Sequence, residues 1–326
     1  MLREFRRIVV SRTDRIGDVV LSLPVFASLK KCFPAGELTA LVQPYTAEVV
    51  SSFHAVDDIL TYDPSESLIS TVRKFKEINA DAILLLFPRF RIALAAFLAR
   101  IPVRVGTAYR WYSFLFNNKV YEHRKDSVKS EAEYNLTLAA AIGCRVRDFE
   151  ARLTIDNQAL KSARDFLDRN GIERFVTVHP GSGGSAANWS PANFRQLSGA
   201  IAKELDVSVV VTGSAAEKEL CGHVSDGNLK CRNAAGVFSI REFIALLSLS
   251  DSFVSNSTGP IHLAASVGTP VVGIYPNNKP MTPTRWAPIT EKKLILTPSD
   301  GSDDLTKVAV DDVLRSVREI SAVKAE

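Results

Sequence analysis

The sequence lacks any apolar run long enough to cross a membrane. Its longest apolar stretches, 81–87 and 92–98, are interrupted by Pro88, Arg89 and Arg91, whereas a membrane-spanning helix needs about 20 apolar residues. The first residues, MLREFRR, lead directly into a strand and lack the apolar core of a signal peptide. We therefore expect a cytoplasmic protein.

Cysteine is scarce, and the four cysteines have no metal-binding spacing. Cys32, Cys144, Cys221 and Cys231 form no CxxC or CxH pair, so the sequence predicts neither a zinc site nor a redox pair. We expect four reduced thiols, as is usual in the cytoplasm. The acidic run at 300–304, DGSDD, lacks the remaining ligands of a calcium loop. We therefore expect a hydrated loop there, and no metal and no cofactor.

Excess charge of one sign is also missing, since 326 residues carry a net charge of only +4. No nucleic-acid partner is expected on this ground. The arginines are nevertheless concentrated in one region, at Arg89, Arg91, Arg100, Arg104 and Arg110. Composition alone favours a solvated face for this region, and an anionic partner or a membrane surface is the alternative.

Predicted strands and helices alternate along both halves of the chain. In the first half, strands are expected at 7–11, 37–41, 58–62, 81–86 and 103–106, with helices at 20–32, 46–52, 67–78, 91–100 and 131–142. In the second half, helices at 157–170, 191–205, 216–225 and 239–247 alternate with strands at 175–179, 208–212, 231–233, near 254 and at 271–275.

This βαβα order is typical of doubly wound parallel sheets. The sequence predicts an α/β protein with two Rossmann-like domains, 1–156 and 157–326, and a last helix at 310–323 that packs back on the first domain. Neither half contains the GxGxxG fingerprint, which argues against a dinucleotide oxidoreductase. The arrangement favours a ligand in a cleft between the two domains.

The run SNSTGPIHLAA at 255–265 is the most informative segment. It joins a predicted buried strand to a helix through small hydroxylated residues, Gly259 and Pro260. The first amides of such a helix are free and face the positive end of its dipole. An ordinary N-cap would explain the segment alone; as a binding site, it would take an anion, most plausibly a phosphate.

Two further loops follow predicted strands of the same half. HPGSGGSAANWSP at 179–191 contains three glycines that let the backbone approach a ligand, and it is not a Walker loop because no GK[ST] follows. TGSAAEKE at 212–219 places Glu217 in the first turn of a helix. Taken alone, Glu217 is best explained by the helix dipole, but it is also a candidate ribose ligand. Together, the three loops favour a nucleotide site.

A third candidate site follows the first strand, in RTDRIGDV at 12–19. Ligands of α/β sheets bind at the carboxyl ends of strands. Asp18 follows a glycine at a helix start, so its carboxylate would be fixed in place. Capping of the helix by Asp18 is equally plausible on position alone, and Asp14 could be the cap instead.

These motifs together resemble glycosyltransferase family 9, whose best-known members are ADP-heptose:lipopolysaccharide heptosyltransferases. The resemblance spans essentially the whole chain and includes AGVFSIRE at 234–241 and the EAEYNL helix at 131–136. It implies a GT-B fold, with the acceptor on the N-terminal half and the nucleotide sugar on the C-terminal half. It also implies inversion at the anomeric carbon without a covalent intermediate.

The resemblance assigns roles to individual residues. Asp18 matches the general base, a role that needs correct placement more than a raised pKa. The resemblance also implies residues that bind the donor, and Trp189 and Gly213 are added because they lie in the same loops. The full set is Gly181, Ser182, Gly183, Trp189, Gly213, Glu217, Ser257, Thr258, Gly259 and His262. The leaving diphosphate would be stabilised by the helix N-terminus and by cations.

The sequence departs from the family pattern at two positions. Ala187 stands where a lysine is common two positions before the tryptophan, and Ser257 replaces an acidic residue. We hypothesise that Lys279 or Arg285, in the loop 276–286, supplies the missing cation. A solvated basic loop is equally consistent with the sequence.

The N-terminal arginines gain a role if the acceptor is an anionic glycolipid. Arg15, Arg89, Arg91, Arg104 and Arg110 would bind its phosphates and carboxylates. The aromatic residues that follow could touch sugar or lipid, although core packing is the more ordinary explanation for them; they are Trp111, Tyr112, Phe114 and Phe116.

The sequence thus predicts a metal-independent, inverting transferase of heptose or a related sugar, acting at the inner membrane face on a lipopolysaccharide-type acceptor. Three alternatives stay open: a family member with another sugar nucleotide and acceptor, a nucleotide-sugar-binding homologue without turnover, and an epimerase on the same two-domain plan.

Overall fold

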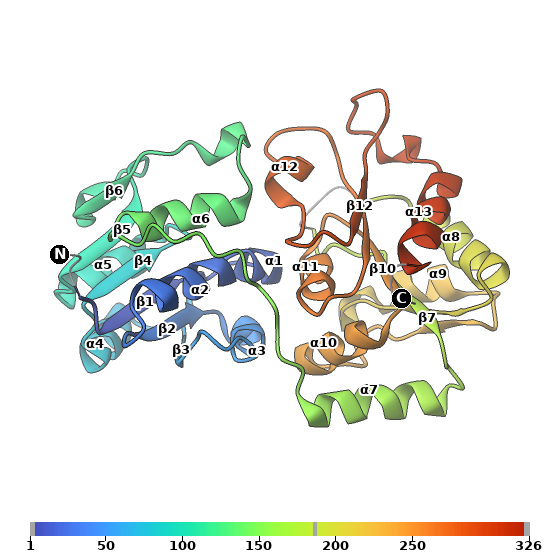
Figure 1. Cartoon of the computed structure of the whole chain (residues 1–326), viewed down its shortest axis with the longest axis horizontal. Helices are drawn as coiled ribbons and strands as arrows, with labels where there is room; N and C mark the ends of the chain where they lie inside the picture. The colour runs from blue at the N-terminus through green and yellow to red at the C-terminus, as the bar shows by residue number, and fades with distance from the viewer. Residues whose placement is uncertain (1–3, 185–187, 323–326) are drawn as a thin grey trace. The chain divides into compact units, whose positions relative to one another are not determined.

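The computed structural model describes residues 4–184 and 188–322 and divides into two compact units, Met1–Leu153 and Thr154–Glu326. The division lies three residues before the boundary predicted at 156. Each unit contains a parallel six-stranded sheet with helices packed on it (Figure 1). Helix α2 packs against α6 and α4 against α5 in the first unit, while α8 packs against α9 and α7 against α10 in the second.

The elements of the first unit alternate as predicted, with two additions. Its strands are β1 (Arg7–Ser11), β2 (Glu37–Val42), β3 (Asp58–Thr61), β4 (Ala82–Leu85), β5 (Val103–Thr107) and β6 (Asn118–Val120). Its α-helices are α1 (Ile16–Val20), α2 (Leu23–Cys32), α3 (Ala47–Val50), α4 (Leu68–Ile78), α5 (Phe90–Leu98) and α6 (Glu131–Ala140). The strand β6 and the separate short helix α1 were not predicted.

The second unit repeats the alternation. Its strands are β7 (Phe175–His179), β8 (Ser208–Val211), β9 (Cys231–Asn233), β10 (Ser252–Asn256), β11 (Val271–Ile274) and β12 (Lys293–Leu296). Its α-helices are α7 (Asn157–Arg169), α8 (Pro191–Glu204), α9 (Lys218–Ser225), α10 (Ile240–Leu249), α11 (Gly259–Ser266), α12 (Pro283–Trp286) and α13 (Val310–Ala322). The strand β12 and the helix α12 were not predicted.

The two sheets have the same winding. Their orders are β3-β2-β1-β4-β5-β6 and β12-β11-β10-β7-β8-β9, and all strand pairs are parallel. In each unit, the first three strands therefore run from the middle of the sheet to one edge. The next three strands start again in the middle and build the other half. The strand order reverses between β1 and β4 and between β7 and β10, which are the switch points where doubly wound folds bind ligands.

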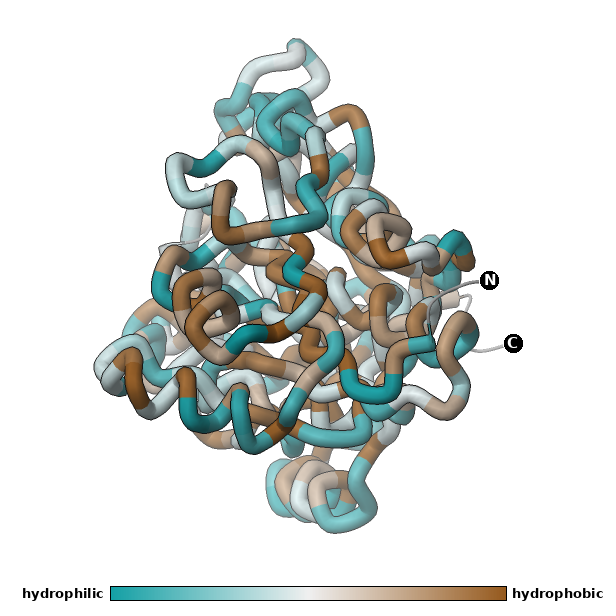
Figure 2. Tube along the Cα trace, turned by 90° about the vertical axis from the view of Figure 1, so that its left-hand side faces the viewer, coloured by the Kyte–Doolittle hydropathy of each residue, from teal (hydrophilic) through white to brown (hydrophobic). Residues whose placement is uncertain are grey.

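The central strands form because they are nearly continuous apolar runs, as expected for parallel strands buried on both faces. In β1, Ile8, Val9 and Val10 have no exposed surface, and β7 and β10 are buried throughout. Helix starts are fixed by side chains: Ser130 and Ser239 form capping boxes with Glu133 and Glu242. Figure 2 shows hydrophobic stretches inside and hydrophilic segments along the outside.

The last helix packs differently from the prediction. Val313, Leu314 and Val317 of α13 belong to the core of the second unit, together with residues of α8, β8 and β11. Arg318 also pairs with Glu204 of α8 at 2.7 Å. The prediction that this helix packs back on the first unit is wrong, because its apolar face covers the sheet of its own unit.

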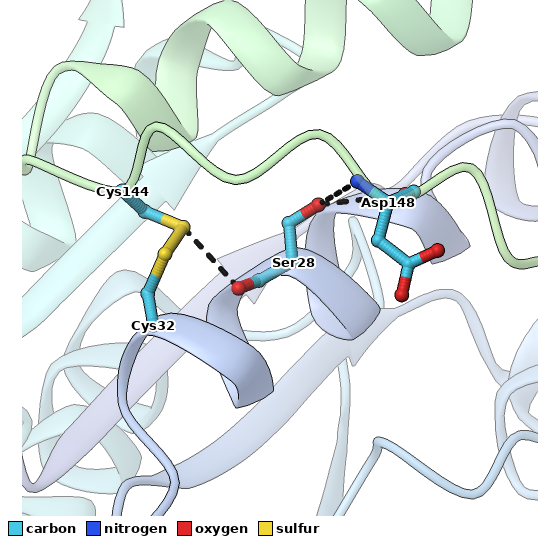
Figure 3. Close-up of a disulfide and its surroundings, with 4 residues drawn as sticks. All are labelled: Ser28, Cys32, Cys144 and Asp148. Carbon is cyan, nitrogen blue, oxygen red and sulfur yellow. Dashed lines mark hydrogen bonds between the residues drawn. A yellow bond between two sulfur atoms is a disulfide. The ribbon is translucent and has the colours of Figure 1, made fainter.

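Two of the cysteines are bonded, which corrects the prediction of four reduced thiols. Cys32 at the end of α2 and Cys144 after α6 form a disulfide with their Cα atoms 5.6 Å apart (Figure 3). They are 112 residues apart in sequence, and spacing alone does not reveal such a pair. Cys221 and Cys231 are free and buried, and burial raises the pKa of each thiol, to about 12 and about 11.

The disulfide is one of several contacts that hold the segment after α6 against helix α2. The Cys144 sulfur is 3.2 Å from the Ser28 carbonyl oxygen, and the Asp148 amide donates to Ser28 Oγ at 2.9 Å (Figure 3). The Asp148 carboxylate also pairs with Lys31 Nζ at 2.6 Å. The segment that leads to the second unit is therefore held along one helix of the first.

None of the helices in the described residues is long and apolar enough to span a membrane.

Candidate functional site

Both switch points carry the loops that the sequence singles out. In the first unit, the loop after β1 contains Asp18 and the loop after β4 contains Arg89. In the second unit, the loop after β7 contains Gly181–Gly183 and the turn after β10 contains Ser257 and Thr258. Because parallel strands end at the same edge of a sheet, each pair of loops is brought together by the topology.

A buried arginine organises the first of these sites. The Arg12 side chain is 3% exposed, and its Nε donates to Asp14 Oδ1 at 2.8 Å while its Nη1 donates to Glu131 at 2.9 Å and to Asn135 at 3.1 Å. Its Nη2 donates to Asp18 Oδ1. Burial alone would lower the pKa of Arg12, but the three carboxylates outweigh it, so the guanidinium stays charged.

Asp18 is therefore held by a fixed cation and is not a helix cap. The N-cap of α1 is Arg15, and no side chain caps this helix. Asp18 lies in the first turn with 16% of its side chain exposed. Asp14 is not the cap either, and burial raises its pKa to about 6 despite the opposing effect of Arg12. A partly exposed carboxylate in a fixed orientation is the geometry that a general base requires.

The five arginines proposed for the acceptor lie in different surroundings. Arg89 reaches the same loop, because its Nε and Nη2 donate to the hydroxyl and the carbonyl of Thr13 at 2.9 and 2.8 Å. Arg91 donates to the carbonyl of Glu66, and Arg15 and Arg110 are exposed.

Arg104 does not belong to this site. It stands near the start of β5, away from the carboxyl edge, and its guanidinium donates to the carbonyls of Ile101 at 2.6 Å and Leu115 at 2.8 Å. It also lies over the ring of Phe97. The prediction that Arg104 binds the acceptor is wrong, because its donors hold two loops of its own unit.

In the second unit, the turn between β10 and α11 presents polar groups without partners. Thr258 is 4% exposed, its side chain does not cap α11, and its Oγ1 has no hydrogen-bond partner among residues 4–184 and 188–322. In the described part of the chain, no protein group accepts from the amides of Thr258 or Gly259. Free amides at the positive end of a helix, beside an unsatisfied hydroxyl, form an anion site.

His262 lies one turn further along α11 and has the same property. It is 4% exposed, and no group of the described residues is a hydrogen-bond partner of its Nδ1. Burial lowers the pKa of His262 to about 3, so the imidazole is neutral at pH 7. Buried polar atoms are nearly always paired, so two unpaired ones in successive turns make this turn a candidate ligand site.

The loop with the hypothesised cations is held beside this turn. Tyr275 is fully buried, and its hydroxyl donates to the carbonyl of Trp286 at 3.1 Å and bonds to the Ser257 side chain. Arg285 precedes Trp286 and lies over its ring, 4.6 Å from the centroid. Lys279 is exposed in the same loop. The structure thus attaches α12 to the anion site, and the role of either cation stays a prediction.

Glu217 joins the two glycine-containing loops. Its carboxylate accepts from the Gly183 amide at 3.2 Å and from the Ser214 amide and hydroxyl at 2.8 and 2.9 Å. These bonds outweigh burial and keep the pKa of Glu217 below its usual value. An ideal Cβ at Gly181 would overlap Glu217 Oε1, and one at Gly213 would lie 2.7 Å from Cys221 Sγ. A carboxylate has about four acceptor positions, which leaves one for a ribose.

Trp189 has a structural role instead of the predicted donor contact. Its side chain is 1% exposed in the core of the second unit, and its Nε1 donates to the Val308 carbonyl at 3.0 Å. Its amide donates to Asn256 Oδ1 at 2.8 Å. The prediction of a donor contact through this side chain is wrong, because the indole fills the space between α8 and the segment before α13. Ala187 lies outside the described residues.

The sequence reasoning missed Arg12, Glu131, Asn135 and Asn256. Asn256 Nδ2 donates to the Pro180 carbonyl at 2.9 Å, so the end of β10 fixes the loop after β7. The signal for two of them was available, since Glu131 and Asn135 are polar residues within the EAEYNL helix and both are fully buried. Their partner Arg12 is about 120 positions away.

The described residues contain no cluster of three or more His, Cys, Asp or Glu side chains that could hold a metal ion.

Two doubly wound units, each with candidate site loops at its switch point, give this protein the GT-B fold of many glycosyltransferases. A family model described as glycosyltransferase family 9 (heptosyltransferase) matches residues 68–309, which is more than half of the chain. The chain therefore belongs to glycosyltransferase family 9.

Individual relatives agree with this assignment. The chain is 30% identical over 330 residues to a Haemophilus influenzae protein named "Putative glycosyltransferase", covering 95% of both chains. It is 24% identical to the lipopolysaccharide core heptosyltransferase OpsX of the same organism, over 85% of this chain and 80% of that one. The structure of E. coli ADP-heptose lps heptosyltransferase II superposes with a TM-score of 0.83 at 19% identity, covering 98% and 100% of the two chains.

Proposed function

We propose that this transferase moves heptose from ADP-heptose to a lipopolysaccharide core or lipid A-type acceptor with inversion at the anomeric carbon. The proposal depends chiefly on one observation: within the described chain, Thr258 Oγ1 and His262 Nδ1 have no partner, and they lie beside the free amides at the start of α11. The names of the relatives support the sugar and the acceptor, since several are lipopolysaccharide heptosyltransferases. An E. coli heptosyltransferase structure contains ADP-2-deoxy-2-fluoro heptose.

The chemistry we propose uses a carboxylate of the first unit and several polar groups of the second. Asp18, oriented by Arg12, takes the proton of the acceptor hydroxyl as its oxygen bonds to the anomeric carbon. The bond from that carbon to the diphosphate breaks, and the leaving oxygens gain negative charge. The amides of Thr258 and Gly259, the Thr258 hydroxyl and His262 then stabilise that charge.

We further propose that Lys279 or Arg285 complements these groups and that no metal ion is needed. Arg285 is supported by the attachment of α12 to Ser257 through Tyr275. Simultaneous replacement, Lys279→Ala with Arg285→Ala, is expected to weaken donor binding and lower turnover, while excess EDTA should leave transfer unchanged. Loss of activity with EDTA that Mg²⁺ restores would contradict metal independence.

A donor panel tests the specificity. ADP-, UDP-, GDP- and CMP-sugars should be compared by thermal shift, since a ligand of the native state raises the melting temperature by mass action. We expect the ADP-sugars to give the largest shift and ADP-heptose to support transfer to a heptose-deficient core acceptor. Transfer from another base would show a family member with a different donor, and binding without sugar release would show a homologue without turnover.

The base is tested by Asp18→Asn, which keeps the shape of the side chain and removes its proton-accepting charge. We expect transfer to fall by about 10²- to 10⁴-fold, with the thermal shift from ADP unchanged because the anion site lies in the other unit. The measurement is initial transfer rate together with ADP affinity. Wild-type rates in the variant would remove Asp18 from the mechanism.

We propose that the reaction takes place at the cytoplasmic face of the inner membrane, where such an acceptor would be presented.

A further inference from the structure

An exposed aromatic surface on the first unit has no part in the chemistry described above. Of the 14 large hydrophobic residues exposed in the described chain, eight fall between 90 and 128. Five of them define what we call the aromatic rim: Phe90, Tyr109, Trp111, Phe114 and Tyr121. Trp111 is 73% exposed and Phe114 68%, although aromatic side chains are normally buried for the most part.

The topology brings four of the five rim residues to one edge of the sheet. Phe90 follows β4, Tyr109 and Trp111 follow β5, and Tyr121 follows β6. The fifth, Phe114, comes next to Ser113, whose hydroxyl donates to the Thr107 carbonyl at the end of β5 at 2.7 Å. These three strands are adjacent and parallel (Figure 1), so the residues after them lie at the same carboxyl edge. The rings are in contact: Phe90 and Trp111 are 4.7 Å apart between centroids, and Tyr109 and Tyr121 are 6.2 Å apart.

The neighbouring residues Tyr112 and Phe116 show that this exposure is specific. Tyr112 is 5% exposed and Phe116 2%, and both belong to the core under α5. Within one short segment, the chain therefore buries two rings and presents Trp111 and Phe114 outward. Packing explains Tyr112 and Phe116, as the sequence favoured, and does not explain the other two.

The rim lies in the most basic part of the chain. Residues 89–129 contain nine lysines and arginines and only two acidic residues, Glu122 and Asp126, which gives this segment a net charge of +7. The whole chain has a net charge of +4, so the rest is net negative. Arg110 stands between Tyr109 and Trp111 and is exposed. Positive charge beside exposed aromatic rings complements an anionic lipid surface, where each cation adds to the attraction and rings occupy the headgroup level.

We propose that the aromatic rim docks the protein on an anionic lipid bilayer, with Trp111 and Phe114 inserted at the headgroup level. This deepens the proposed function, on which it rests for its purpose, because a glycolipid acceptor resides in such a surface. The carboxyl edge of the sheet that carries the rim also carries Arg89, which bonds Thr13 in the loop of Asp18. Docking through the rim brings the lipid surface to the edge where the base lies.

The test is co-sedimentation of the full chain with vesicles, without donor or acceptor. We expect binding to phosphatidylcholine vesicles containing phosphatidylglycerol, little binding to pure phosphatidylcholine, and weakening by salt. The double variant Trp111→Ser with Phe114→Ser should lose about tenfold or more in partitioning. The matched control is Ile69→Ser in α4, which has the same 73% exposure and lies outside the rim; it should bind as the wild type does.

Two further measurements separate this proposal from the proposed function. Vesicles should shift the tryptophan emission to shorter wavelength, and the Trp111→Ser change should remove the shift. Of the other two tryptophans, Trp189 is already buried, and Trp286 belongs to the second unit, where its indole donates to the Pro280 carbonyl at 2.8 Å. The double variant should keep ADP affinity and transfer to a lipid-free core oligosaccharide, and lose transfer to acceptor in vesicles.

The proposal is overturned if wild type and double variant bind anionic vesicles equally, or if Ile69→Ser loses as much binding. It is also overturned if light scattering shows a dimer that the double variant abolishes, since the rim would then join two copies. Vesicle binding without heptosyl transfer would leave the rim assigned and reject the proposed function alone.

Discussion

At the scale of single residues, the unpaired Thr258 hydroxyl makes stability and binding respond in opposite directions. Thr258→Val keeps the shape and removes a buried group without a partner, so the empty protein should be as stable or more stable. ADP affinity should fall by roughly 10- to 100-fold, as for a lost hydrogen bond to a charged group. Melting temperature and isothermal titration measure the two effects.

A matched control is available in the same unit. Thr269 is equally buried, but its Oγ1 donates to the Leu247 carbonyl at 2.6 Å. Thr269→Val should therefore destabilise the protein and leave ADP affinity unchanged. If Thr258→Val destabilised the empty protein and bound ADP normally, its hydroxyl would have a structural partner and the anion site would be wrong.

Asp14 should make stability depend on pH. Burial raises its pKa to about 6 in the folded protein, from 3.8 in the unfolded chain. Between about pH 6 and pH 4 the folded state binds a proton that the unfolded state does not, so this group favours folding more as the pH falls. The melting temperature of wild type, relative to that of Asp14→Asn, should therefore rise as the pH falls from 7 to 4. The difference should level off at lower pH, where Asp14 is protonated in both the folded and the unfolded state. A constant difference over that range would contradict the buried carboxyl.

At the scale of elements, Gly181 in the loop after β7 is required by the contact of this loop with Glu217. Gly181→Ala would force Glu217 away from the Gly183 and Ser214 amides, because the new Cβ overlaps Glu217 Oε1. We expect a loss of ADP affinity of roughly tenfold or more, in line with hydrogen bonds to a charged group. Calorimetric titration with ADP measures it.

The control for that variant is Gly199→Ala in α8, where a Cβ meets nothing within 4 Å. This change should stabilise the helix by about 0.5–1 kcal/mol and leave ADP affinity unaltered. Equal ADP affinity in both variants would show that the Glu217 contact does not shape the donor loop.

Elements with strong local patterns were predictable from the sequence, and those fixed by distant partners were not. The buried strands β1, β4 and β7 were predicted within one residue because their apolar runs are continuous. The strands β6 and β12 were missed because they are short edge strands, none of whose residues is fully buried. Asp18 and the turn at Thr258 were found from motifs, whereas the Arg12–Glu131 pair needed the fold.

At the scale of the whole molecule, the Cys32–Cys144 bond should stabilise the first unit. In the chain-entropy account, closing a loop of this length removes unfolded-state freedom worth about 4–5 kcal/mol. Adding dithiothreitol should therefore lower the denaturant midpoint. Replacing both cysteines by serine should lower the midpoint as much as dithiothreitol does. A reduced wild type that unfolds at the oxidised midpoint would contradict this.

The free thiols provide the internal control for reduction. Cys221 and Cys231 are buried, and burial raises the pKa of both thiols, so neither should react with an alkylating agent in the folded protein. Dithiothreitol should therefore have no further effect on the double serine variant.

The division at Leu153 and Thr154 leaves one crossing of the chain between units that have their own sheets and their own cores. Such a junction permits recombination. A hybrid enzyme that combines residues 1–153 with the second half of a relative should fold, and it should inherit its nucleotide preference from one parent and its choice of glycan from the other.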